Sequence, residues 1–471
     1  MASKVALPWF ASIGSLEASG VFRDAMKPAP AGLRTAPARV PALLLALLLQ
    51  SCAWRGDGPG QGVWLAAWGS AQLAVEPMPA ASAPAVAWQE PLHDASLRQV
   101  LRITAAGDAL RVRVSNLFGK APLVLGSAAV SLADAAGTGG AERPPQARAQ
   151  TVRALRFAGQ PGLTLAPGAE AWSDPVELPV PRQAELLVDL HLLQGAAPAT
   201  AHPGSRIHSW AAPGAQVGQA AWPGAAPRIG WWYLAALDVR SRSALPVLAA
   251  IGDSITDGYG VPPGSYQRWP DLLAQRIAAA QQPASVVNTG IGGNRLLRDG
   301  LGPSVLSRFD RDALARSGVT HAALLIGVND LGVQRRNGQD SPAARAALLQ
   351  ELQQGLRTLA QQAHARGVCL AVATVLPYGG SGYYKPGPEN EADRVALNGW
   401  IRGAAGFDAV IDFDALMRDP AKPDRLRPDL DSGDGLHPSM AGYRAMAEAF
   451  PLALLDRRCG ATAVVPLPQA G

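Results

Sequence analysis

Hydrophobic and polar residues follow two different periods along the chain. In residues 62–240 they alternate over short stretches separated by Gly and Pro, which is typical of β-strands. The stretch QVLRITAAGDALRVRVSN (99–116) has two alternating runs around Ala-Gly-Asp and predicts a hairpin. Further short strands are predicted in PLVLGSAAVSLA, ALRFAG, VELPV and AELLVDLHLL. The pattern predicts an all-β sandwich, jelly-roll-like, over residues 62–240.

The pattern changes at residue 246. Five near-continuous apolar runs follow, namely VLAAIGD, SVVNTGI, HAALLIGVND, VCLAVATVLP and AVIDF. Amphipathic segments separate them, the clearest at residues 342–367. Strands buried on both faces and joined by helices predict a parallel sheet, here a flavodoxin-like three-layer α/β/α domain over residues 245–457. The segment RSRSALP (240–246) joins the two domains, and residues 458–471 are expected to be a loose tail.

Residues 1–51 have the pattern of an export leader. An apolar run at residues 40–49 follows Arg34 and Arg39 and is shorter than the roughly 20 residues that span a bilayer. The next residues, Gln50-Ser51-Cys52, complete a resemblance to the lipobox of bacterial lipoproteins, which predicts lipidation at Cys52. The alternative is a plain secretory signal that happens to precede a cysteine.

Two further expectations concern this leader. A start at Met26 would give an ordinary basic leader, so residues 1–25 are expected to be an over-called start. Ala53, where an Asp would favour the inner membrane, predicts lipid anchoring in the outer membrane of the cell envelope, by similarity to Gram-negative sorting rules.

Net charge and cysteine content give one further expectation each. The net charge is +5, most of it in the leader, and no clustered basic face or nucleic-acid motif is present, so we expect no nucleic-acid partner. Cys369 begins the fourth predicted strand of the parallel sheet and Cys459 follows the last helix, which places both at the same rim. In an exported protein they are candidates for a disulfide, and the alternative is two isolated small apolar residues.

Eight tryptophans fall between residues 62 and 240. Exposed tryptophans can stack on sugar rings, whereas buried ones fill a sandwich core. We expect most of them to lie in the core; they are Trp64, Trp68, Trp88, Trp172, Trp210, Trp222, Trp231 and Trp232.

Polar residues follow the ends of the predicted parallel strands. Ser254 follows the first strand, NTGIGGN (288–294) the second, and Asn329 the third. Asp434 and His437 stand three residues apart before the last helix. Taken singly, each has an ordinary structural explanation, such as a helix cap, a turn or a surface histidine. Together they are expected to meet, because ligands bind at the carboxyl ends of the strands in an open α/β sheet.

These residue types suit acyl transfer. A serine hydroxyl needs a base, which His437 can supply, and an imidazole needs a partner such as Asp434 to fix its tautomer. The tetrahedral intermediate needs preorganised hydrogen-bond donors, for which the candidates are the backbone N–H groups of Ser254 and Gly293 and the side-chain amide of Asn329.

Ser254, Gly293, Asn329 and His437 resemble, in order, the four signature residues of the SGNH (GDSL) hydrolase superfamily, and Asp434 falls at the position of its acid. The stretch GDSITDG has Ile where the consensus has Leu, and Gly290 and Gly292 are neighbouring candidates in the second block. The resemblance covers residues 245–457. It implies a serine esterase, EC 3.1.1.-, that needs no cofactor and no metal.

The first half of the chain also resembles known proteins, through less specific motifs. AAWGSAQ and LRQVLRITAAGDALRVRVSNLFG are similar to two-domain bacterial SGNH esterases that include xylan-associated arylesterases, which implies carbohydrate esters as substrates. The alternatives are a lysophospholipase or thioesterase, an acyltransferase, or a surface-anchored glycan-binding lipoprotein without activity. The loop at residues 376–392 offers Tyr378, Tyr383 and Tyr384 either as an acyl or aromatic pocket or as loop packing. The expected partners are an ester substrate and, through Cys52 alone, a membrane.

Overall fold

The computed structural model describes residues 62–76, 92–135, 140, 143–403 and 406–459. The leader, Cys52, Trp88 and most of the predicted tail lie outside these residues, so the predictions made for them stay predictions. In the described part of the chain, no helix is both long enough and apolar enough to cross a membrane.

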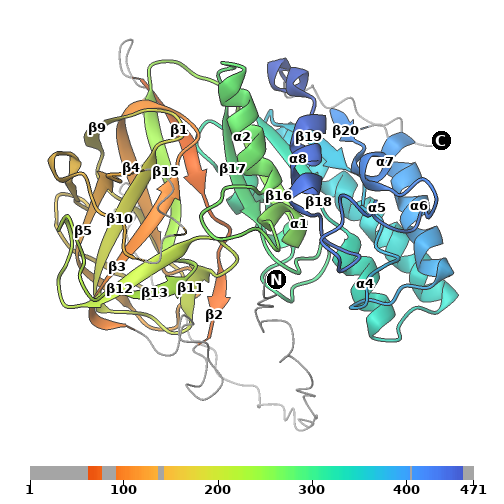
Figure 1. Cartoon of the computed structure of the whole chain (residues 1–471), viewed down its shortest axis with the longest axis horizontal. Coiled ribbons are helices and arrows are strands. Elements are labelled where there is room, and N and C mark those ends of the chain that lie inside the picture. Colours follow the sequence, from red (N-terminus) through yellow and green to blue (C-terminus); the bar gives the residue numbers. More distant parts are fainter. Residues whose placement is uncertain (1–61, 77–91, 136–139, 141–142, 404–405, 460–471) are drawn as a thin grey trace, which may run out of the picture. The chain divides into compact units, whose positions relative to one another are not determined.

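The first half is built from antiparallel strands in three sheets (Figure 1). One sheet has the order β1-β15-β4-β8 with β9 beside β4, a second has the order β13-β12-β3-β10-β5-β6 with β7 beside β5, and a third has the order β14-β11-β2. The strands are β1 (Val63–Gly69), β2 (Leu73–Val75), β3 (His93–Arg102), β4 (Gly107–Ser115), β5 (Leu123–Leu132), β6 (Arg153–Leu155), β7 (Leu163–Leu165), β8 (Glu170–Trp172), β9 (Val176–Val180), β10 (Glu185–Gln194), β11 (Ala199–His202), β12 (His208–Pro213), β13 (Ala226–Ile229), β14 (Trp231–Trp232) and β15 (Leu234–Ser241).

The two larger sheets enclose one apolar core. Val112 of β4 and Leu237 of β15 contribute from one sheet, and Val100 of β3 and Leu190 of β10 contribute from the other. The predicted all-β sandwich is therefore confirmed. Most of the described tryptophans lie in the interior as expected, and the buried ones are Trp68, Trp210, Trp222, Trp231 and Trp232.

The predicted hairpin at residues 99–116 is wrong. β3 pairs with β10 and β12, whereas β4 pairs with β15 in the other sheet. The link at residues 103–106 therefore carries the chain across the sandwich, and it is held there because the Thr104 N–H donates to the Ala67 carbonyl at 2.9 Å. Alternating residues mark two strands, but they do not determine whether those strands pair with each other or face each other across a core.

The second half is the predicted parallel sheet. Its order is β17-β16-β18-β19-β20, as in flavodoxin-like folds, and the predicted fold class is confirmed. The strands are β16 (Val247–Gly252), β17 (Ser285–Gly290), β18 (His321–Leu325), β19 (Cys369–Ala373) and β20 (Ala409–Ile411). The helices are α1 (Ser254–Asp257), α2 (Trp269–Ala279), α3 (Val305–Phe309), α4 (Val328–Arg336), α5 (Pro342–Ala365), α6 (Pro388–Gly403), α7 (Phe413–Met417) and α8 (Met440–Ala449).

Both faces of this sheet are covered. Ala249 of β16 packs in a core with α4, α5 and α6, whereas the next residue, Ala250, packs with α2, α7 and α8 on the opposite face. The strand sequences are continuously apolar for this reason. The helix predicted at residues 342–367 is α5, which Ser341 caps by accepting a hydrogen bond from the Ala344 N–H.

The antiparallel and parallel regions share buried contacts. Leu65 and Ala66 of β1 belong to the core that also holds Val247 and Ile251 of β16. The Ser285 hydroxyl of β17 donates to the Ala66 carbonyl at 2.7 Å. β1 therefore contributes to both halves, and the core of the parallel region includes residues from the other end of the sequence.

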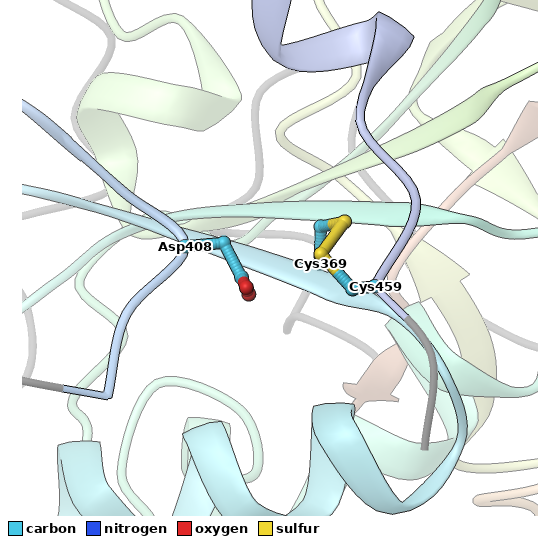
Figure 2. Close-up of side chains that lie close together, drawn as sticks. All are labelled: Cys369, Asp408 and Cys459. Atoms are coloured by element: carbon cyan, nitrogen blue, oxygen red, sulfur yellow. A yellow bond between two sulfur atoms is a disulfide. The ribbon is translucent and has the colours of Figure 1, made fainter. Parts of the chain in front are cut away.

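Cys369 at the start of β19 forms a disulfide with Cys459, and their Cα atoms lie 5.1 Å apart (Figure 2). The predicted pairing is confirmed. The bond closes a loop over a sequence separation of 90 residues and ties the segment after α8 to the sheet.

Cys369→Ser, Cys459→Ser and the double variant are expected to lower the free energy of unfolding by similar amounts, about 2–4 kcal/mol, because each one releases the same loop in the unfolded chain. Denaturant unfolding of the three variants and the oxidised wild type measures this. If the single variants unfold at the wild-type denaturant concentration, the disulfide does not stabilise the fold.

Candidate active site

The ends of three neighbouring strands bring the predicted residues together. Gly252, the last residue of β16, is in register with Gly290 of β17 and with Leu325 of β18. A Cβ atom on Gly252 would lie 2.4 Å from the Leu325 carbonyl oxygen, so this position requires glycine. Ser254 begins α1 two residues later, and the preceding Asp253 caps this helix by accepting a hydrogen bond from the Ile255 N–H.

A buried arginine donates hydrogen bonds to the backbone at the ends of these strands. The Arg308 guanidinium is fully buried and donates to the carbonyls of Gly252 at 2.9 Å and Thr289 at 2.6 Å. Its Nε donates to the Asn294 side chain at 3.0 Å. The backbone around Ser254 and the loop after β17 are therefore fixed by one side chain, which the sequence analysis did not identify.

Ser254, His437 and Asp434 form a continuous chain of hydrogen bonds. The Ser254 hydroxyl lies 2.8 Å from His437 Nε2, and His437 Nδ1 donates to Asp434 Oδ2 at 2.6 Å. Because a carboxylate only accepts, the ring hydrogen sits on Nδ1, and Nε2 is left to accept the serine proton. Ser254 and His437 are buried, whereas the Asp434 side chain is 40% exposed.

Hydrogen bonds from nearby backbone N–H groups orient the Asp434 side chain toward the His437 imidazole. Asp434 Oδ1 accepts from the N–H groups of Leu436 at 2.9 Å and His437 at 2.8 Å, so a single turn sets both side chains. Burial raises the pKa of the Asp434 carboxyl, but the hydrogen bond from His437, its charge and the backbone donors outweigh burial and bring the pKa to about 2. The carboxyl is therefore ionised at neutral pH.

The predicted oxyanion donors Gly293 and Asn329 follow the two strands that flank β16. Gly293 has a φ of 73°, a backbone conformation that is strained for residues with a side chain, so this position favours glycine. Asn329 is the second residue of α4, and its amide donates to the Asn294 carbonyl at 2.8 Å. That amide carries two hydrogens, which leaves one for a substrate oxygen.

Two further side chains hold Asn329 and the segment that follows Gly293. The Tyr384 hydroxyl donates to Asn329 Oδ1 at 2.5 Å and so fixes the orientation of the amide. Asp330 accepts from the N–H groups of Leu296 at 2.8 Å and Leu297 at 3.1 Å. The only sequence signal for Asp330 is its place directly after Asn329.

The three tyrosines have different surroundings. Tyr378 and Tyr384 are almost fully buried, whereas Tyr383 is 42% exposed. Tyr378 packs edge-on against Tyr384, so these two are part of the interior behind Asn329. Their location favours loop packing over the lining of an acyl pocket.

Among the described residues, one group has the donor spacing of a metal site. It consists of Cys369, Cys459 and Asp408 (Figure 2). The two sulfur atoms are bonded to each other, and Asp408 accepts from His364 at 2.8 Å and from the Leu370 N–H at 2.7 Å. Because a metal binds thiolates rather than a disulfide, these residues do not fit a metal ion.

Residues 250–445 match the GDSL-like Lipase/Acylhydrolase family. The C-terminal half of the chain therefore carries a GDSL-like acylhydrolase domain, preceded by the antiparallel region. This domain is a GDSL-family acylhydrolase or esterase, EC 3.1.1.-.

Several solved structures resemble this region. A lipase/acylhydrolase from Enterococcus faecalis is 20% identical with a TM-score of 0.36, and the match covers 45% of this chain and 97% of that one. A GDSL-like lipase from Bacteroides thetaiotaomicron is 17% identical with a TM-score of 0.33, covering 45% and 88%. A psychrotrophic esterase from Pseudoalteromonas is 19% identical with a TM-score of 0.32, covering 43% and 93%. No curated protein matches the chain.

The stability of the protein should depend on pH through the Asp253 carboxyl. Burial raises the pKa of this carboxyl to about 7. A carboxyl whose pKa is higher in the folded than in the unfolded protein adds to the stability while it is protonated in both states. For Asp253 this contribution is complete below the pKa in the unfolded chain, about 3.9, and it is lost as the pH rises toward 7. Asp253→Asn keeps an oxygen for the Ile255 N–H, so its melting temperature minus that of the wild type should increase between pH 4 and pH 7.

Thermal melts at half-unit pH steps measure this difference. Asp134→Asn, at an exposed loop position, serves as the control for replacing a carboxylate by an amide. A difference for Asp253→Asn that does not change with pH would contradict the prediction.

Proposed function

We propose that the protein cleaves acyl esters with Ser254 as nucleophile, and that its natural substrates are carbohydrate esters. The observation that supports the mechanism is the hydrogen-bond chain from Ser254 through His437 to Asp434. In this mechanism Ser254 attacks the ester carbonyl while His437 takes the hydroxyl proton. The N–H groups of Ser254 and Gly293 and the Asn329 amide hold the oxyanion.

Collapse of the intermediate then releases the alcohol. His437 gives its proton to the leaving oxygen, and Asp434 stays ionised and stabilises the charged imidazole. Water repeats the cycle on the acyl-enzyme, with His437 again as the base. The leaving alcohol therefore departs on the side of the site where His437 lies.

The surroundings of His437 support a polar, ring-shaped alcohol. The Tyr259 ring stacks on the imidazole with 4.1 Å between centroids, and the Arg206 guanidinium lies 5.5 Å from the Tyr259 centroid. Arg206 comes from the segment after β11 and is partly exposed. An aromatic ring and a guanidinium beside the imidazole suit a sugar with its hydroxyls better than an aliphatic chain.

The catalytic roles have a direct test. Ser254→Ala and His437→Ala should each abolish nearly all turnover of p-nitrophenyl acetate, because the residues act as a unit. Asn329→Ala should lower kcat by roughly 10²–10³, the cost of one lost oxyanion donor. Asp434→Asn should also lower kcat strongly.

His364→Ala is the matched control for these variants, because it breaks another His–Asp pair of the same region and should leave kcat unchanged. An organophosphonate should label Ser254 alone, as mass spectrometry of its peptides will show. Labelling of another serine, or full activity of Ser254→Ala, would overturn the assignment.

The substrate class is tested with acetylated xylan beside p-nitrophenyl esters of rising chain length. Arg206→Ala should lower kcat/KM on acetylated xylan by about 10-fold or more, the cost of a charge-assisted hydrogen bond, and on p-nitrophenyl acetate by less than about 3-fold. Arg206→Lys should fall between the wild type and Arg206→Ala.

Other outcomes identify the alternatives. A rate that rises with acyl chain length and no activity on the glycan would favour a lysophospholipase or thioesterase. Formation of a new ester when a second alcohol is added would favour an acyltransferase.

A further inference from the structure

We infer that His202, in the antiparallel region, is a positioning residue for the loop after β17 that carries Gly292 and Gly293, here called the oxyanion loop. This inference rests on the proposed role of Gly293 as an oxyanion donor. His202 is the last residue of β11 and is buried. Its ring reaches a carboxylate that lies within one helical turn of Ser254.

Both nitrogens of the His202 ring are engaged. Nδ1 lies 2.7 Å from the Ala71 carbonyl oxygen, and Nε2 lies 2.8 Å from Asp257 Oδ1. The ring also stacks on Trp231 with 5.9 Å between centroids. The orientation of the imidazole is therefore set by the antiparallel region before it contacts Asp257.

Asp257 links the His202 ring to the oxyanion loop through its two carboxylate oxygens. It is the last residue of α1, which begins at Ser254, and its side chain is buried. Its second oxygen, Oδ2, accepts from the Gly292 N–H at 3.1 Å, next to Gly293. One carboxylate thus connects the nucleophile helix, the oxyanion loop and the antiparallel region.

Two glycines pack closely against Asp257. A Cβ atom on Gly204 would lie 2.0 Å from Asp257 Oδ2, and one on Gly290 would lie 2.4 Å from the Asp257 nitrogen. The segment after β11 and the end of β17 therefore both contact Asp257 through glycine. Without the bond from His202, the Asp257 carboxylate would lose its only imidazole donor among the described residues and be free to rotate away from Gly292.

Two conservative variants separate the two bonds of the His202 ring. In His202→Gln the amide nitrogen takes the place of Nε2 and keeps the bond to Asp257. In His202→Asn the amide nitrogen takes the place of Nδ1 and keeps only the bond to Ala71. A general packing role would make the two variants similar, whereas positioning through Asp257 makes them different.

The experiment measures kcat and KM on p-nitrophenyl acetate with the full-length protein. We expect His202→Asn to lower kcat by about 10-fold to 10²-fold, the usual cost of a small displacement of catalytic groups, with KM within about 2-fold of the wild type. His202→Gln should keep kcat within about 3-fold of the wild type.

His191→Asn is the matched control. His191 is a buried histidine of β10 that lies 2.9 Å from Asp94 within the antiparallel region, so its replacement should leave kcat unchanged. Equal kcat for His202→Asn and His202→Gln, or an equal loss in His191→Asn, would overturn the inference. Failure of the proposed function would be seen separately, as wild-type protein without esterase activity or Ser254→Ala with full activity.

Discussion

The parallel register of β16 with its two neighbours is the constraint on which the site depends. Gly252 lies opposite both Gly290 and Leu325, so three strands end at one edge of the sheet. Each strand is then followed by a different kind of residue: a serine, a glycine loop and an asparagine. A shift of register by one residue would turn the side chains of β16 toward the opposite core and move Ser254 away from Gly293 and Asn329. Arg308 stabilises this alignment because its guanidinium donates to the backbone of both β16 and β17.

The position of His437 at this edge of the sheet depends on local hydrogen bonds and not on strand register. Asp434 and His437 lie in the segment before α8, outside the sheet, and their geometry is set by hydrogen bonds within three residues. Gly435 has a φ of 69°, and a Cβ atom there would lie 2.2 Å from the Gly380 carbonyl carbon. The segment therefore packs directly on the loop after β19. Ser254 receives its base because this contact holds a rigid turn against the sheet edge.

Much of this arrangement was predictable from the sequence, and what was missed has a common cause. Ser254, Gly293, Asn329, Asp434 and His437 were predicted because each follows a strand or precedes a helix in a local pattern that resembles a known family. The hydrogen bonds from Ser254 to His437 and from His437 to Asp434 agree with this prediction, whereas the oxyanion roles of Gly293 and Asn329 stay predictions. The hairpin at residues 99–116 was predicted wrongly because alternation determines strands and not their partners. The contacts of Tyr384 with Asn329 and of His202 with Asp257 join residues about 55 positions apart. No local pattern marks such contacts, because they depend on how loops pack after the sheets have formed.

The two halves of the chain are consequently not a catalyst with an independent appendage. β1 supplies Leu65 and Ala66 to the core of the parallel region, the segment after β11 brings Arg206 beside Tyr259, and His202 contacts Asp257. These contacts reach different parts of the hydrolase region, namely its core, the side where we propose that the alcohol leaves, and the proposed oxyanion loop. Ser254 and His437 both come from the parallel region, one after β16 and the other from the segment before α8. In this protein, the groups that surround them are shared with the antiparallel sheets, so changes in those sheets are a route by which substrate choice and turnover can change without altering the triad.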